Sequence, residues 1–197
     1  WMLHEYSLKY KSNKIGSRTG ETKTKEYLNM NPKAKIPTLC HKNVTITESV
    51  AAVNYISYNF DKPNNFFIPT NPKEIAKSEE WISFAIMELD CLGIYTLRRH
   101  EKPENMGLSN IYGEAPNAVK TARDHFERMI TACENNVPSE GYLLDENISV
   151  ADIIFSSSLM HCDMFNISIK SEKVFNYFER VKNTKNYQNA YKDCFSK

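Results

Sequence analysis

The first sixty residues change their pattern of apolar and polar positions several times. Residues 3–10 (LHEYSLKY) alternate apolar and polar side chains, which predicts a strand. The polar stretch 11–24 contains two glycines and predicts an exposed loop, and residues 25–30 predict a short helix that ends before a proline. Two β-rich runs, 36–40 and 44–47, lie on either side of three polar residues and predict a hairpin.

A helical pattern follows the hairpin, since Val53, Ile56 and Phe60 recur at helical spacing. Residues 61–72 (DKPNNFFIPTNP) then hold three prolines and several asparagines, which is typical of a linker between domains. We therefore expect one domain over residues 1–62, a linker over 63–72 and a second domain over 73–197.

The second domain is predicted to be entirely helical. Ile82, Ala85, Leu89 and Leu92 form one apolar stripe at helical spacing, and residues 150–165 are apolar on most sides, as in a helix buried within a bundle. No convincing strand follows residue 70. The order of patterns predicts an α/β domain followed by an all-α bundle.

The amino-acid composition limits the classes of binding partner that the sequence supports. The 197 residues contain 25 basic and 24 acidic side chains, a formal net charge of +1, so nothing in the balance favours a nucleic acid or a membrane surface. The longest apolar runs are too short to span a bilayer. The five cysteines form no Cys-x-x-Cys pair, so no metal site is predicted and a reducing, cytoplasmic compartment is the simplest interpretation.

Two short motifs carry candidate binding chemistry. Lys35-Ile36-Pro37 begins a predicted strand, where a proline in the cis form leaves the backbone of the preceding residue available to an extended peptide. Glu48-Ser49 begins a predicted helix, where unpaired backbone N–H groups accept a carboxylate and a glutamate pairs with an ammonium group. Taken singly, each motif is more often an ordinary loop proline or an ordinary helix cap.

A third motif has a structural interpretation. Ser149 and Asp152 have the spacing of a capping box, and Ile148 and Ile153 are placed as a hydrophobic staple. We interpret this segment as the start of the buried helix and not as part of an active site.

In this order and at this spacing, the motifs resemble the glutathione transferase family. The matching segments are NPKAKIPTL (31–39), ITESVAAVNYI (46–56), GYLLDENISVADIIF (141–155) and FERVKNTKNYQNAY (178–191). They span essentially the whole chain. The family's Arg-Pro pair near the end is replaced here by Thr184-Lys185-Asn186, and the loop at 17–21 looks more like bacterial and theta-type members.

The resemblance implies a thioredoxin-like N-terminal domain, an all-α C-terminal domain, glutathione as co-substrate and a homodimer. It implies that Ile36 pairs its backbone with the cysteinyl part of glutathione before a cis Pro37. Glu48 and Ser49 would hold the γ-glutamyl end, and Lys35 would contact the glycyl carboxylate. A small hydrophobic electrophile would be the second substrate, with Trp81, Glu88, Leu92 and Tyr95 as candidate contacts; core or dimer-interface roles remain the alternative for most of these four.

The catalytic residue is not identified. Family members place the group that activates the glutathione thiol between a first strand and a first helix, and by resemblance we expect both elements upstream of Trp1. Conjugation of glutathione to electrophiles is the first hypothesis. A non-catalytic binding or assembly module of the same fold is the second, and a thiol-disulfide or dehalogenating activity is a weaker third.

Overall fold

The computed structural model, which describes residues 1–16 and 19–195, divides after Asn64 into two units. Residues Met2–Asn64 form the small unit, and Asn65–Lys197 together with Trp1 form the helical unit. Two residues of the predicted surface loop, Ser17 and Arg18, lie outside the described residues.

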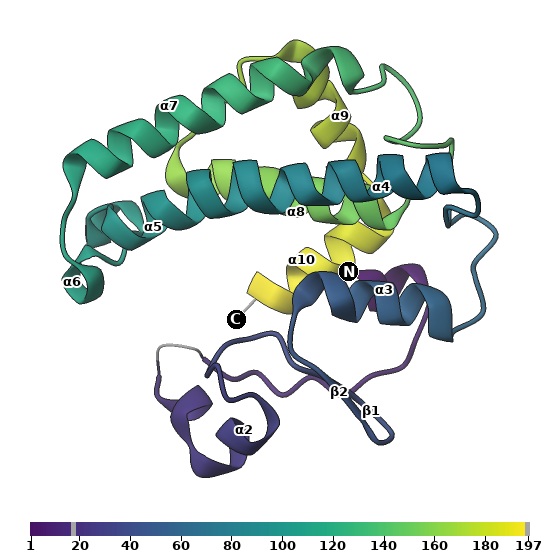
Figure 1. Ribbon diagram of the computed structural model, residues 1–197, viewed down its shortest axis with the longest axis horizontal. Helices are drawn as coiled ribbons and strands as arrows, with labels where there is room; N and C mark the ends of the chain where they lie inside the picture. Colours follow the sequence, from purple (N-terminus) through teal and green to yellow (C-terminus); the bar gives the residue numbers. More distant parts are fainter. Residues whose placement is uncertain (17–18, 196–197) are drawn as a thin grey trace. The chain divides into compact units, whose positions relative to one another are not determined.

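The small unit combines short helices with one hairpin (Figure 1). Its elements are α1 (Met2–Glu5), the 3-10 helix η1 (Glu21–Lys23), α2 (Lys25–Met30), β1 (Leu39–His41), β2 (Val44–Ile46) and α3 (Ser49–Asn59). The two strands are antiparallel, with Cys40 opposite Thr45, and Lys42 takes a positive φ of 53° in the turn. The predicted helix at 25–30 and the helix from 49 are confirmed. The hairpin is confirmed too, but its first strand begins at Leu39 and not at the predicted residue 36, so Ile36 and Pro37 lie in the loop before it.

The predicted strand over residues 3–10 is wrong. Met2–Glu5 is helical, and Met2, Glu5 and Tyr6 are buried at the spacing of one helix face. That face packs against α3, where the Tyr6 hydroxyl donates to the Ser57 carbonyl oxygen at 3.3 Å. So few residues do not fix the period of the pattern, and packing against α3 decided between helix and strand.

The helical unit begins with a long helix in three segments. They are α4 (Pro72–Phe84), the π-helix η2 (Ala85–Tyr95) and α5 (Thr96–His100). The predicted stripe is confirmed at Ile82, Ala85 and Leu89, whereas Leu92 is 47% exposed. The wider winding of a π-helix turns later positions away from the face expected for 3.6 residues per turn.

The remaining helices complete the bundle. They are the 3-10 helix η3 (Pro103–Asn105), α6 (Ser109–Tyr112), α7 (Pro116–Cys133), the 3-10 helix η4 (Glu134–Asn136), α8 (Val150–Phe165), α9 (Glu172–Lys182) and α10 (Lys185–Phe195). Helix α8 packs against α4 and η2, while α7 packs against η2 and α5 (Figure 1). Buried positions on all sides of α8 confirm the prediction of a central helix. The α/β piece and the all-helical piece therefore follow one another in the predicted order.

The start of the helical unit is tied to the segment before α8. Phe66 is 1% exposed and forms a parallel β-bridge with Ile148, and the Phe67 N–H donates to the Ile148 carbonyl oxygen at 2.8 Å. Among the described residues, no helix is long and apolar enough to cross a membrane.

Candidate functional site

The loop before β1 presents an exposed backbone turn. The Ile36-Pro37 peptide bond is cis, as predicted, and Ile36 is 51% exposed although it is a large apolar residue. Lys35 and Pro37 are also exposed. The turn is thus accessible to a ligand on the surface of the small unit.

Two buried side chains hold this turn. The Tyr27 hydroxyl and the Asn31 amide each donate to the Lys35 carbonyl oxygen at 2.7 Å. Both also bond the Thr38 hydroxyl, at 2.8 and 3.2 Å, and the Lys33 N–H donates to the Asn31 side-chain oxygen at 3.2 Å. Because Asn31 is fully buried, its side chain fixes the backbone before Ile36 and the Thr38 hydroxyl after it. The sequence indicated only that α2 ends at Asn31, so these two roles were missed.

The start of α3 supplies the other half of the predicted site. Glu48 is the N-cap residue and its side chain makes no capping bond, while Ser49 is the first helical residue and is exposed. Ser49 is therefore one position inside the helix and does not act as its cap. The backbone N–H groups of the first turn of a helix have no partner within it, and they favour an anion.

Lys33 joins the two halves of the site. Its ammonium group forms an ion pair with the Glu48 carboxylate and donates to the Thr47 carbonyl oxygen at 3.2 Å. The structure therefore brings the 31–37 loop against the start of α3, as the order of motifs suggested. Lys33 was not identified from the sequence. Its only signal there was a second lysine two positions before Lys35.

The Lys33–Glu48 pair is exposed, with 43% and 70% of the two side chains accessible. Ion pairs of this kind contribute about 0–1 kcal/mol. An ammonium group of a ligand can therefore replace Lys33 on Glu48 at little cost, which leaves Lys33 available for a ligand carboxylate. The arrangement can bind both charges of an amino-acid head group.

The four predicted second-substrate residues do not share one cavity. Glu88 lies 3.0 Å from the His125 imidazole on α7, Leu92 is exposed, and the Tyr95 ring lies 5.8 Å from the Arg99 guanidinium carbon. Trp81 alone among the four lines the cavity described next. A role of these residues in binding an electrophile stays a prediction.

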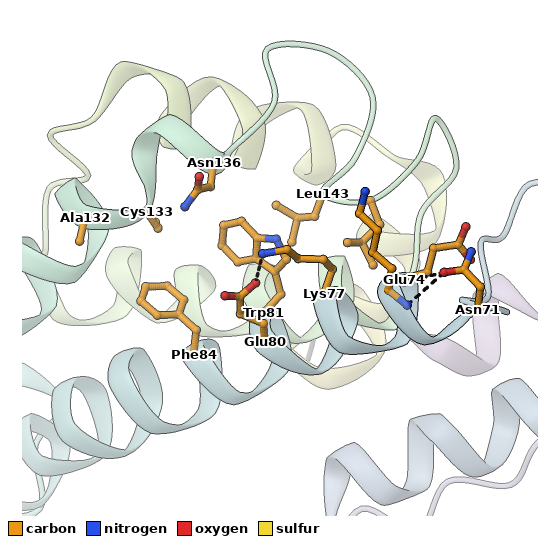
Figure 2. Close-up of a pocket in the computed structure, with 12 residues that line it drawn as sticks. Asn71, Glu74, Lys77, Glu80, Trp81, Phe84, Ala132, Cys133, Asn136 and Leu143 are labelled. Carbon is orange, nitrogen blue, oxygen red and sulfur yellow. Dashed lines mark hydrogen bonds and ion pairs between the residues drawn. The ribbon is translucent and has the colours of Figure 1, made fainter.

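A cavity of about 780 Å³ lies between α4 and the end of α7 within the helical unit (Figure 2). Trp81, Phe84 and Leu143 give it apolar walls, and the Lys77–Glu80 ion pair, with a distance of 2.5 Å, lies at its rim. Its volume is in the usual range for small-molecule sites. Polar side chains line it as well, among them Asn71, Lys73, Glu74 and Asn136.

Asp152 has the structural role expected from the capping box. Its carboxylate accepts hydrogen bonds from the Ser149 N–H at 2.8 Å, the Leu143 N–H at 2.8 Å and the Tyr177 hydroxyl at 2.7 Å. Burial raises the pKa of Asp152, and these hydrogen bonds oppose that shift. All of its partners belong to the folded scaffold, so Asp152 organises the core of the helical unit.

Two further titratable groups lie inside the helical unit. Burial lowers the pKa of His161 on α8, and the Asp90 carboxylate opposes that shift. Burial likewise raises the pKa of Asp90 on η2, against the opposing charges of His161 and Arg98. Burial also raises the pKa of the Cys133 and Cys162 thiols to about 12, which makes both weak nucleophiles.

Two family models match the chain. The model described as glutathione S-transferase, N-terminal domain, matches residues 1–58, and the model described as glutathione S-transferase, C-terminal domain, matches residues 90–189.

Two curated relatives illustrate the range of similar proteins. Elongation factor 1-gamma from Prunus avium is 31% identical over 137 residues, which cover 70% of this chain and 30% of that protein. Glutathione S-transferase 2 from Schizosaccharomyces pombe is 27% identical over 158 residues, which cover 78% of this chain and 64% of that protein. The chain therefore spans less than two thirds of the length of either relative.

Solved structures establish the fold. A glutathione transferase from Phanerochaete chrysosporium, in complex with oxidized glutathione, superposes with a TM-score of 0.79 at 20% identity, covering 98% of this chain and 88% of that one. A glutathione transferase homolog from Lodderomyces elongisporus, solved with two glutathione molecules per subunit, gives a TM-score of 0.83 at 18% identity, covering 97% and 90%. The small unit is thus thioredoxin-like, and the helical unit is the second domain of the same fold.

Proposed function

The chain belongs to the glutathione S-transferase family, and we propose that its small unit binds glutathione and that the protein transfers the glutathione thiol to small hydrophobic electrophiles. The observation that carries the proposal is the Lys33–Glu48 ion pair, because it joins an exposed backbone turn to the start of a helix. Those two features match the two ends of an extended peptide that begins with an amino-acid head.

In the proposed complex, each part of glutathione meets a group of matching chemistry. The γ-glutamyl ammonium replaces Lys33 on Glu48, and the γ-glutamyl carboxylate accepts hydrogen bonds from the first turn of α3 at Ser49. The cysteinyl backbone pairs with the backbone of Ile36 as an added strand. Lys35 contacts the glycyl carboxylate.

Transfer then requires the thiolate. The cysteine thiol of glutathione gives its proton to solvent water, the thiolate sulfur forms a bond to the electrophilic carbon, and the leaving group departs with the electrons of its own bond. No described residue is assigned the task of stabilising the thiolate. Binding and turnover are therefore tested separately.

The binding test compares three forms of the full-length protein by titration calorimetry with glutathione. Glu48→Gln removes the charge that pairs with the ligand ammonium, and we expect affinity to fall about ten-fold or more, since hydrogen bonds to charged groups contribute roughly 1.5–3 kcal/mol. Glu26→Gln is the matched control, because Glu26 is an exposed glutamate on α2 outside the site. Equal affinity in all three forms removes Glu48 from the site, and no binding by the wild type overturns the proposal.

The turnover test measures conjugation of an aryl halide to glutathione by the full-length protein. Release of halide together with the thioether product supports the transferase. Tight glutathione binding without product supports the second candidate, a non-catalytic binding or assembly module. The 31% identity to a protein named as an elongation factor favours that second candidate.

We also propose that the protein is a homodimer located in the cytoplasm. The family resemblance favours a homodimer, and sedimentation at several protein concentrations tests it. All five cysteines are free thiols, which is consistent with a cytoplasmic location.

A further inference from the structure

A cation between two aromatic rings lies at the end of the long helix of the helical unit. The Arg99 guanidinium carbon is 4.3 Å from the centroid of the Tyr112 ring and 5.8 Å from that of the Tyr95 ring. Both distances are within the range of cation–π attraction, about 6 Å. Tyr95 ends η2, Arg99 is in α5 and Tyr112 ends α6, so residues from three elements meet at this point.

The turn that carries Tyr112 is held firmly. The Leu108 N–H donates to the Arg98 carbonyl oxygen at 2.8 Å, and His100 Nδ1 donates to the Gly113 carbonyl oxygen at 2.9 Å. A side chain at Gly107 would place its Cβ 1.9 Å from the Glu101 carbonyl oxygen, so only glycine fits there. The Tyr112 ring is therefore positioned over Arg99 by the backbone of the turn.

Arg99 has no anionic partner among residues 1–16 and 19–195. Its Nε is buried and makes no hydrogen bond, and its contacts are the two rings. Other arginines of the unit are satisfied: Arg123 bonds the Glu101 carboxylate at 3.2 Å, and Arg180 bonds the Pro138 carbonyl oxygen at 3.1 Å. Among the described residues the Arg99 guanidinium has no protein acceptor, and its Nη groups would donate to an acceptor that a ligand supplies.

The two rings that contact Arg99 are partly exposed. Tyr95 is 37% exposed and Tyr112 46%, and Ile111, the residue before Tyr112, is 59% exposed. Large apolar side chains with this much exposed area are favourable contacts for a flat hydrophobic ligand. We name the set Tyr95, Arg99, Ile111 and Tyr112 the Arg99 site.

We propose that the Arg99 site binds small aromatic carboxylates. The planar guanidinium offers two parallel N–H donors to a carboxylate, and the two tyrosine rings with Ile111 contact the aromatic body. The site lies wholly within the helical unit and does not depend on glutathione. Evidence against this site therefore leaves the proposed transferase activity unaffected, and evidence against the transferase activity leaves this site unaffected.

The test is a titration without glutathione, using 2-naphthoate and its uncharged amide, 2-naphthamide, as probes. Backbone amide NMR shifts in the full-length protein measure affinity and place the ligand. We expect the shifts to concentrate at residues 95–113, and naphthoate to bind more tightly than naphthamide. Naphthoate affinity should fall about ten-fold in Arg99→Gln, with naphthamide affinity unchanged, since the lost interaction is a charge-assisted hydrogen bond.

Three comparisons keep the result interpretable. Arg128→Gln removes an exposed arginine from α7 that pairs with His125, and it should leave naphthoate affinity unchanged. Tyr112→Ala removes one ring and should weaken both probes. Arg99→Lys keeps the charge without the planar fork and should still weaken naphthoate. Shifts centred elsewhere, equal binding of the two probes, or full affinity in both Arg99 variants would overturn the proposal.

Discussion

The two units of this protein order their polar groups in opposite ways. In the helical unit, the Asp152 carboxylate lies inside an apolar core and connects α8, the preceding loop and α9 through Leu143 and Tyr177. In the small unit, the Asn31 amide is buried beneath an exposed loop and connects Lys35 and Thr38. One network stabilises a scaffold, and the other shapes a surface for a ligand.

The difference follows from the number of buried apolar side chains around each hydrogen-bond network. The small unit buries few large side chains among its described residues, notably Met2, Tyr6, Tyr27 and Ile56. A two-stranded hairpin has little stability of its own, and here it is supported through the hydrogen bond between His41 and the Tyr55 hydroxyl at 2.8 Å. Hydrogen bonds therefore carry more of the local order in the small unit.

The largest expected effect tests the scaffold side of this comparison. Asp152→Ala leaves several buried donors without an acceptor, and the free energy of unfolding should fall by about 3–5 kcal/mol, measured by denaturant titration. Asp124→Ala is the control, since Asp124 is exposed and pairs only with Lys120; it should change stability by less than about 0.5 kcal/mol. Similar losses in the two variants would contradict the structural role of Asp152.

A second variant tests the Asn31 hydrogen-bond network, which shapes the proposed ligand site of the small unit. Asn31→Ala frees the loop that carries Ile36, and ordering it again costs roughly 1–2 kcal/mol per residue, so glutathione affinity should fall about ten-fold. Hydrogen exchange should accelerate at residues 32–38 and remain unchanged in α8. Asn59→Ala, an exposed amide of the same unit, should have neither effect. Faster exchange throughout α8 would show that the two networks are not separate.

A smaller effect is expected from a substitution in the Lys33–Glu48 ion pair, in which we propose that a ligand ammonium replaces Lys33. Lys33→Met frees Glu48 before the ligand arrives but also removes a cation for the ligand carboxylate. Because an exposed pair contributes only about 0–1 kcal/mol, we expect glutathione affinity to change by less than about five-fold. Calorimetry on Lys33→Met measures it. A loss as large as that in Glu48→Gln would make Lys33 a principal ligand contact.

The last effect is a pH dependence of the helical unit. The lowered pKa of His161 means that the folded chain takes up a proton less readily than the unfolded chain, whose histidines titrate near 6.5. Falling pH therefore favours unfolding, by less than about 1.4 kcal/mol per pH unit. Between pH 7 and pH 5, the wild type should lose stability relative to His161→Gln in denaturant titrations. A constant difference would contradict a buried, neutral His161.

Several features were predictable because their causes are local. Proline and asparagine at 31–32 end α2, the three polar residues at 41–43 mark the hairpin, and the serine and aspartate of the capping box begin α8. Each depends on neighbours within a few positions. The strand predicted at 3–10 failed because its choice of structure depended on α3, some fifty residues later.

The candidate site was predictable only in part for the same reason. Glu48 and Ser49 were identified because a helix start can be recognised from adjacent residues. Lys33 and Tyr27 were missed because their roles depend on where the 31–37 loop lies against α3 and on which carbonyl faces inward. The Arg99 site was missed as well, since Tyr112 reaches Arg99 only through the fold of the intervening turn.

The sequence by itself determined the order of the two units, the family and the starts of a few helices, because periodicity, caps and motif spacing act over short stretches of chain. Only the tertiary structure decided which charges meet, which polar atoms are buried without a partner, and that Met2–Glu5 is helical. Those outcomes depend on distances between residues far apart in the chain. Packing sets such distances, and no pattern of neighbouring residues encodes them.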